Sequence, residues 1–192
     1  MVTGHRREPM PHTHAHHLLN PLRGLILSPK GLAKRLNLRP DSTVLELGPG
    51  PGYFSPEVAR AVPEGKLILV DVQQEMLDMA KERLEAKGIG NVEYRRADAI
   101  SLPAESESFD VVFLVAALGE VRDRGACLRE IHRVLRPDGL LSITEFKISD
   151  PDFIPLPELT ASVQSAGFRC CARHGFLFHY TIDCRKAAGN AA

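Results

Sequence analysis

From about residue 41, short apolar runs rich in β-forming residues alternate with segments in which apolar residues recur at helical spacing. The predicted strands are TVLEL, KLILVD, VEYRR, FDVVFLV and LLSITEF. Predicted helices follow the first, second and fourth of these strands. The first has Ser55 as its N-cap, the second runs from Gln74 to Lys87, and in the third Leu128, Ile131 and Leu135 share one face. Single strands that alternate with amphipathic helices form a parallel sheet covered on both faces. The predicted fold class is therefore α/β, with a doubly wound sheet.

The C-terminal part of the chain departs from this alternation. The helix with Leu135 is predicted to end at Pro137-Asp138-Gly139, and another helix is predicted near residues 156–166. Two β-like runs, RCCARH and LFHYTIDCR, then follow with only Gly175-Phe176 between them. Such a short connection joins only antiparallel strands. The prediction is a seven-stranded, mostly parallel sheet with a C-terminal antiparallel hairpin.

Size and charge limit the classes of partner. The chain has 192 residues, enough for one well-buried domain. Its 24 basic and 24 acidic side chains give no net charge that would attract nucleic acid or acidic membranes. The longest apolar run, VVFLVAAL, is too short to span a bilayer, and no signal-peptide core is present. We therefore expect a cytoplasmic protein, monomeric or homodimeric, with small-molecule partners. The four cysteines lack CxxC spacing and are predicted to be buried thiols rather than disulfides or zinc ligands.

The predicted domain covers residues 29–186, between an N-terminal arm, residues 1–28, and a disordered tail, residues 187–192. The arm contains five of the eight histidines, four of them in HTHAHH. A disordered polar arm is the preferred interpretation, followed by a lid over the cofactor and then by a metal site. No metal ligand is assigned.

A glycine-rich turn follows the first predicted strand in VLELGPGPGYFS. Its spacing is G-x-G-x-G, whereas dinucleotide sites require G-x-G-x-x-G, and Tyr53 stands where that pattern needs glycine. Glu46 lies at the mouth of the turn, where a carboxylate repels a pyrophosphate and attracts a cation. A ligand with ammonium and sulfonium groups, such as S-adenosylmethionine, fits this charge.

Two further acids follow the next predicted strands. Asp71 ends the second strand, where its carboxylate can accept hydrogen bonds from both ribose hydroxyls. Asp98 follows the third strand and can accept from the exocyclic amine of adenine, while the Ala99 amide can donate to a ring nitrogen. Each acid alone is more often a cap or loop residue, so the prediction depends on their order.

This order resembles that of class I S-adenosylmethionine-dependent methyltransferases, over nearly all residues from 32 to 185. The segment FDVVFLVAALGEVRDRGACLREIHRVLRPDGLLSITEF also resembles the part of such enzymes from strand four to strand five. The resemblance implies a Rossmann-like methyltransferase fold, in which Val72 packs on adenine. The predicted cofactor-binding residues are Glu46, Gly48, Pro49, Gly50, Gly52, Tyr53, Asp71, Val72, Asp98, Ala99 and Val115.

Methyl transfer needs an aligned nucleophile and excluded water more than it needs a general base. Where base-modifying relatives often have Asn/Asp-Pro-Pro-aromatic after strand four, this chain has Val115-Ala116-Ala117-Leu118. Quinone-biosynthesis relatives often have a histidine pair just beyond, and here Gly119-Glu120 occupies that place. Glu120 is the candidate catalytic acid. The prediction is a methyltransferase that acts on a small acceptor and releases S-adenosylhomocysteine; the alternatives are a non-catalytic S-adenosylmethionine-binding protein and a dinucleotide-dependent oxidoreductase.

Overall fold

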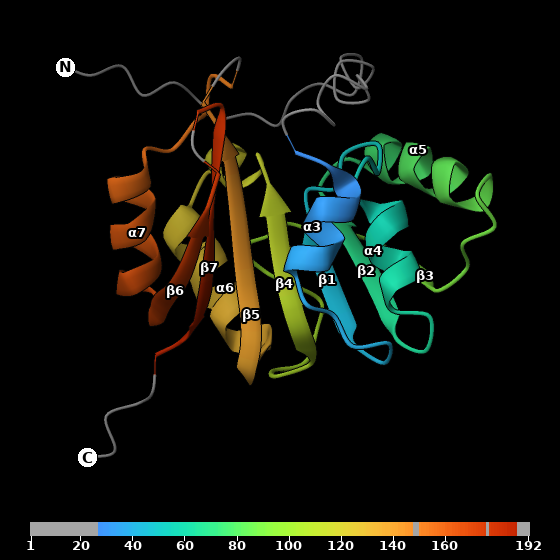
Figure 1. Cartoon of the computed structure of the whole chain (residues 1–192), viewed down its shortest axis with the longest axis horizontal. Coiled ribbons are helices and arrows are strands. Elements are labelled where there is room, and N and C mark those ends of the chain that lie inside the picture. The colour runs from blue at the N-terminus through green and yellow to red at the C-terminus, as the bar shows by residue number, and fades with distance from the viewer. Residues whose placement is uncertain (1–26, 148–149, 176, 188–192) are drawn as a thin grey trace.

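The computed structural model describes residues 27–147, 150–175 and 177–187. Helices follow the first, second and fourth strands, whereas the third strand connects to the fourth through a segment without a helix (Figure 1). The strands are β1 (Thr43–Leu47), β2 (Lys66–Asp71), β3 (Val92–Arg96), β4 (Phe109–Val115), β5 (Leu135–Phe146), β6 (Phe168–His174) and β7 (His179–Lys186). The helices are α3 (Pro29–Arg35), α4 (Ser55–Ala61), α5 (Gln74–Glu85), α6 (Arg124–Val134) and α7 (Leu156–Ser165), with a 3₁₀ turn, η2, at Leu118–Glu120.

The strands form one seven-stranded sheet in the order β3-β2-β1-β4-β5-β7-β6. Neighbours from β3 to β5 pair in parallel, whereas β7 pairs antiparallel with both β5 and β6. The predicted mostly parallel sheet with a C-terminal antiparallel hairpin is therefore confirmed. Strand order reverses between β1 and β4, and ligands of open α/β sheets bind at the carboxyl ends of the strands near such a point.

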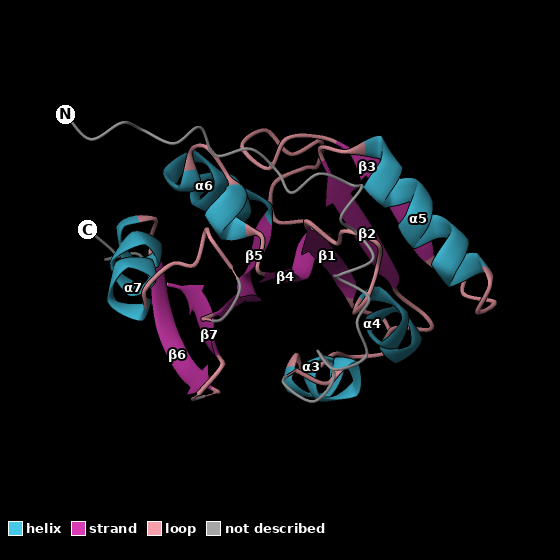
Figure 2. Cartoon of the chain, turned by 90° about the horizontal axis from the view of Figure 1, so that it is seen from above, coloured by secondary structure: helices cyan, strands magenta, loops and turns pink. Residues whose placement is uncertain are grey.

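Helices cover both faces of this sheet, as the view in Figure 2 shows for α3 and α4 on one side and α6 on the other. On the first face, Leu32, Val58 and Leu77 from α3, α4 and α5 pack in one buried cluster with β1, β2 and β4. On the second face, Leu128 of α6 and Leu159 of α7 pack in another buried cluster with the C-terminal strands. The helices thus pack their apolar faces against the sheet, as the spacing of apolar residues in the sequence predicts.

The boundary between α6 and β5 differs from the prediction. The helix ends at Val134, and β5 begins at Leu135, which has extended dihedral angles and pairs with Phe109. The carbonyl of Val134 accepts a hydrogen bond from the Ser108 amide at 2.8 Å. The segment before β4 therefore supplies a hydrogen-bond donor to a carbonyl at the end of the helix. β5 therefore spans Pro137-Asp138-Gly139, which local sequence signals mark only as a helix stop; its pairing with β4 shifts register between Leu135, opposite Phe109, and Leu140, opposite Val111.

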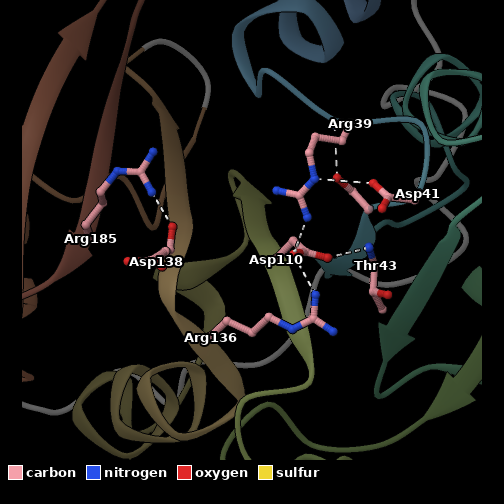
Figure 3. Close-up of polar contacts among 8 residues, drawn as sticks. Arg39, Asp41, Thr43, Asp110, Arg136, Asp138 and Arg185 are labelled. Carbon is pink, nitrogen blue, oxygen red and sulfur yellow. Dashed lines mark hydrogen bonds and ion pairs between the residues drawn. The ribbon is translucent and has the colours of Figure 1, made fainter.

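At the amino ends of the strands, Asp110 connects three segments (Figure 3). Its carboxylate accepts from the Thr43 amide at 2.8 Å, from Arg39 at 3.0 Å and from Arg136 at 2.6 Å. Burial acts to raise the pKa of Asp110, but these donors together hold it below its ordinary value. Beside this group, Arg185 of β7 donates to the Asp138 carbonyl. The network lies at the edge of the sheet opposite the glycine turn and holds β1, β4 and β5 together.

Candidate cofactor-binding site

The glycine turn leaves β1 at the carboxyl edge of the sheet with Gly48, Gly50 and Gly52 at φ values of +66°, +52° and +71°. This left-handed region favours glycine. The Gly48 amide donates to the Val70 carbonyl at 2.9 Å, which ties the turn to the end of β2. A Cβ at Gly48 would lie 2.7 Å from the Ala117 Cβ, and one at Gly52 would lie 3.0 Å from the Ala80 Cβ. Both glycines are therefore required by packing as well as by conformation.

The other two predicted residues of the turn have structural contacts. The carbonyl of Pro49 accepts from the Gly52 amide at 3.1 Å, which closes the turn. The half-buried Tyr53 ring lies edge-on to Phe54, with 4.9 Å between ring centroids. The turn is thus held from within and leads directly into α4.

Glu46 lies buried beneath this turn, with 3% of its surface exposed. Its Oε2 accepts a hydrogen bond from the Ser55 hydroxyl at 2.6 Å. Burial is the main cause that raises its pKa to about 8, while Ser55 lowers it and Asp71 raises it further. The prediction that Ser55 is the N-cap of α4 is wrong. Ser55 is the first helical residue and Phe54 occupies the cap position. The serine hydroxyl donates its hydrogen bond to Glu46 instead of to the helix backbone.

Asp71, at the end of β2, lies beside the same turn. Its Oδ1 accepts from the Gln73 amide at 3.0 Å. Burial raises its pKa, and backbone hydrogen bonds from Gln73, Gly50 and Val72 oppose that shift. The Val72 side chain is 38% exposed, one of three large apolar side chains that are exposed in the described part of the chain. An exposed valine beside a half-buried acid offers an apolar surface next to a hydrogen-bond acceptor.

Asp98 and Ala99 follow β3 at the same edge of the sheet. The amide of Ala97 donates to the Asp71 carbonyl at 3.0 Å, which joins the ends of β2 and β3. Asp98 Oδ1 accepts from the Ile100 amide at 3.2 Å, and its Oδ2 accepts from Arg122 at 2.8 Å. Ala99 is partly buried against the core. The contact with Arg122 was not predicted, because 24 residues separate the pair and no local pattern links them.

The end of β4 closes the other side of the glycine turn. Val115 is half-buried, and Ala116 adopts φ of +52°, a conformation that costs a non-glycine residue energy. Its amide donates to the Thr144 carbonyl at 2.8 Å, so pairing with β5 maintains the conformation. Glu120 ends η2 and is half-buried. The adjacent Gly119 lies so close to the Asp152 carbonyl that a Cβ would overlap it, which places the segment before α7 beside η2.

Sequence reasoning missed Glu145, near the end of β5. The residue is fully buried, its Oε2 accepts from the Ile154 amide at 3.3 Å, and its Oε1 has no hydrogen-bond partner. Burial raises its pKa to about 8, the Ile154 amide lowers it, and the nearby charges of Asp150, Arg124 and Asp152 act in both directions. The available signal was an acid in the otherwise apolar end of SITEF.

Other candidates do not join this site. His132, predicted to be structural, packs edge-on against Phe168 with ring centroids 5.2 Å apart. The predicted arm lies outside the described residues except for the buried Leu27 and for Ser28, which caps α3; of the predicted tail only Ala187 is described. Within residues 27–147, 150–175 and 177–187, no three His, Cys, Asp or Glu side chains gather to hold a metal ion. No helix in those ranges is both long and apolar enough to cross a membrane.

Comparison with known proteins identifies the family. A family model described as a methyltransferase domain matches residues 44–139, which is half of the chain and includes the turn and all three acids. The chain belongs to the class I S-adenosylmethionine-dependent methyltransferase family. The expected Rossmann-like methyltransferase fold is confirmed by a solved S-adenosylmethionine-dependent methyltransferase from Aquifex aeolicus, with a TM-score of 0.83 and 24% identity over 93% of this chain and 100% of that one.

Two further known proteins are similar to this methyltransferase-family chain. The Escherichia coli ubiquinone/menaquinone biosynthesis C-methyltransferase UbiE is 40% identical over 121 residues, which cover 62% of this chain and 47% of UbiE. The match therefore spans about half the length of that relative. The methyltransferase CalH, solved in complex with S-adenosylhomocysteine, has a TM-score of 0.70 and 23% identity over 82% of this chain and 55% of that one.

Proposed function

We propose that this protein transfers a methyl group from S-adenosylmethionine to a small-molecule acceptor. S-adenosylmethionine supplies the electrophilic methyl group, and the chain's own residues bind the donor, orient it and exclude water. Family membership supports the donor, and the arrangement at the carboxyl edge of the sheet supports the assignment of individual residues.

The proposal gives each acid a separate task. Glu46, as a carboxylate, attracts the ammonium group of the donor, and Asp71 accepts from the ribose hydroxyls. Val72 packs on the adenine ring, which agrees with its exposed side chain. Asp98 accepts from the adenine amine, and the Ala99 amide donates to a ring nitrogen. In this assignment Arg122 orients Asp98 through its 2.8 Å contact.

The observation that carries the proposal is the position of Glu46. Its carboxyl group is buried next to a turn in which three alternate glycines have positive φ values. A dinucleotide would place its pyrophosphate at the following helix N-terminus, where its negative charge would oppose ionisation of the buried Glu46 carboxyl group. A cationic donor removes the cost of ionising Glu46 in a buried site, so the same residue that opposes a dinucleotide favours S-adenosylmethionine.

For the acceptor we propose a small molecule that reaches the methyl group from the side of β4 and η2. The name of UbiE describes a C-methyltransferase of ubiquinone and menaquinone biosynthesis, which supports a small acceptor without defining this one. The end of β4 offers alanines rather than polar groups that would hold a nucleobase nitrogen. Glu120 is the proposed acid near the acceptor, at the end of η2.

Calorimetric titration of the full chain with S-adenosylhomocysteine, NAD and NADP tests the donor. We expect saturable binding of S-adenosylhomocysteine alone, and tight binding of NAD or NADP instead would refute the proposal. A screen of small acceptors with a methyl-labelled donor then tests transfer. Donor binding without transfer to any acceptor class would favour the alternative of a non-catalytic S-adenosylmethionine-binding protein.

A further inference from the structure

Three of the four cysteines lie together on the C-terminal hairpin, away from the proposed donor site. Cys170 of β6 and Cys184 of β7 are directly opposite each other in the antiparallel register. The Cys184 thiol donates to the Cys170 sulfur, and the two Sγ atoms are 3.1 Å apart. Cys171 is exposed, and its thiol donates to the Asp183 carbonyl at 3.2 Å. All of these thiols are free, but the prediction that the cysteines are buried is wrong for exposed Cys171 and half-buried Cys170, because the edge strand β6 leaves them partly uncovered.

The backbone around Cys170 and Cys184 already suits a disulfide. Residues directly opposite on antiparallel strands have Cα atoms about 4.5–5.5 Å apart, which lies inside the range of about 4.4–6.8 Å for disulfides. The two sulfurs must approach by only about 1 Å to reach the bond length of about 2.0 Å. A small rotation of the side chains achieves this without a change of register.

A β-bulge separates the roles of the vicinal cysteines. The register shifts between Cys170 and Ala172, so Cys170 keeps its place opposite Cys184 while Cys171 lies at the bulge. Cys170 is half-buried, whereas Cys184 is fully buried. An oxidant therefore reaches Cys170 before it reaches Cys184. Burial, together with the neighbouring Cys170 sulfur, raises the pKa of Cys184 and keeps it a thiol.

We propose that Cys170 and Cys184 form a reversible thiol–disulfide pair that is oxidised by peroxides. The Cys170 thiolate attacks the peroxide, so that a sulfur–oxygen bond forms, the oxygen–oxygen bond breaks and water leaves after protonation. Cys184 then attacks the sulfenic sulfur of Cys170: the sulfur–sulfur bond forms, the sulfur–oxygen bond breaks, and the proton of Cys184 leaves with the hydroxyl as water. Two thiols and one hydrogen peroxide give one disulfide and two waters.

The crosslink would tie the edge strand β6 to β7 and thereby stabilise the hairpin. β7 in turn contributes Tyr180, whose hydroxyl donates to the Ile154 carbonyl in the segment beside η2. The closed loop runs from residue 170 to residue 184, a length for which loop closure gives a clear stabilisation of the native state. Oxidation is thus expected to raise the unfolding temperature without changing a residue of the donor site.

Treating the reduced full chain with hydrogen peroxide tests the proposal. Counted with a thiol reagent in denaturant, free thiols should fall from four to two. Peptide mapping should show one monomeric crosslink between Cys170 and Cys184, a mass loss of about 2 Da, and reversal by dithiothreitol. The oxidised chain should unfold at a temperature higher by roughly 5–10 °C.

Matched variants identify the pair. Cys170→Ser and Cys184→Ser should each abolish the crosslink and the temperature shift, whereas Cys171→Ser and Cys127→Ser should retain both. Cys184 is buried, so the Cys184→Ser variant could fail to fold. In that case the Cys170→Ser variant, at a half-buried residue, still tests whether the crosslink requires this pair. Overoxidised thiols without a crosslink, a crosslink that requires Cys171, or crosslinked dimers would each overturn the proposal. Binding of S-adenosylhomocysteine is measured separately and is expected to be unchanged, so these outcomes are independent of the proposed function.

Discussion

At the scale of single residues, Glu46 couples donor binding to pH. Its pKa is raised from 4.5 to about 8, so the ligand-free protein holds the carboxyl protonated at neutral pH. A cationic donor favours the ionised form, and binding must then release a proton. We expect affinity for S-adenosylhomocysteine to rise between pH 6.5 and 8, by up to about tenfold per pH unit.

Calorimetry in buffers with different ionisation enthalpies measures both the affinity and the released proton. Glu46→Gln should bind more weakly, should release no proton, and should lose the rise with pH. An affinity for the wild-type chain that does not change across this range would contradict the expected protonation of Glu46.

Asp71 is the second residue whose substitution should weaken donor binding without changing the fold. We expect Asp71→Ala to weaken binding of S-adenosylhomocysteine by roughly 1.5–3 kcal/mol, the range for losing hydrogen bonds to a charged group. Asp41→Ala is a suitable control, because Asp41 is exposed and pairs with Arg39 at the opposite edge of the sheet. Titration calorimetry measures the affinity, and circular dichroism checks the fold. Equal affinities of the two variants would mean that Asp71 is only a loop acid.

At the scale of elements, the glycine turn and the end of β4 depend on each other. Gly48→Ala would add a Cβ 2.7 Å from the Ala117 Cβ, at a residue with φ of +66°. Because overpacking costs about 1–3 kcal/mol and a left-handed alanine costs about 1–2 kcal/mol, we expect a loss of about 2–5 kcal/mol in the free energy of unfolding. Denaturant unfolding measures this loss.

Gly90→Ala supplies the matched control, since nothing lies within 4 Å of an added Cβ and its φ is not positive. We expect Gly90→Ala to change stability by less than about 0.5 kcal/mol. If both variants were equally stable, the turn would be able to move away from β4, and the packing argument for Gly48 would fail.

At the scale of the whole molecule, the buried carboxyl of Glu145 makes stability depend on pH. Its folded-state pKa of about 8 exceeds the ordinary 4.5, so folding takes up a proton between these values. The contribution of the neutral carboxyl is fully present below pH 4.5 and is lost as pH rises toward 8. The slope is at most about 1.4 kcal/mol per pH unit.

Glu145→Gln cannot ionise, so the unfolding temperature of the variant should exceed that of the wild type increasingly from pH 5 to pH 8. Thermal unfolding followed by circular dichroism measures the difference. Exposed Glu64→Gln, with the same change of chemistry at the surface, should show no such trend. A constant difference between Glu145→Gln and the wild type at all pH values would show that Glu145 ionises freely in the native state.

Much of the fold and of the candidate site could be predicted because the signals are local. Strand boundaries at residues 43–47, 66–71 and 109–115 follow from apolar runs bounded by polar or turn residues, and the strand at 92–96 follows from β-forming Val92 and Tyr94 at alternate positions. Parallel alternation places the ends of these strands at one edge, so the order of Glu46, Asp71 and Asp98 implied a shared site before any contact was known. The assignment of those three acids to parts of the donor stays a prediction.

The sequence by itself thus determined which segments become strands and helices, the parallel pairing of the first five strands, and the sheet edge at which Glu46, Asp71 and Asp98 lie. Only the tertiary structure decided which side chains meet across that framework: Ser55 serves Glu46 instead of capping α4, Arg122 joins Asp98, and Cys170 meets Cys184. The physical reason is the distance along the sequence over which each kind of interaction acts. Propensity and periodicity act over a few residues, whereas these contacts depend on register and on helix docking, which only the packed core sets.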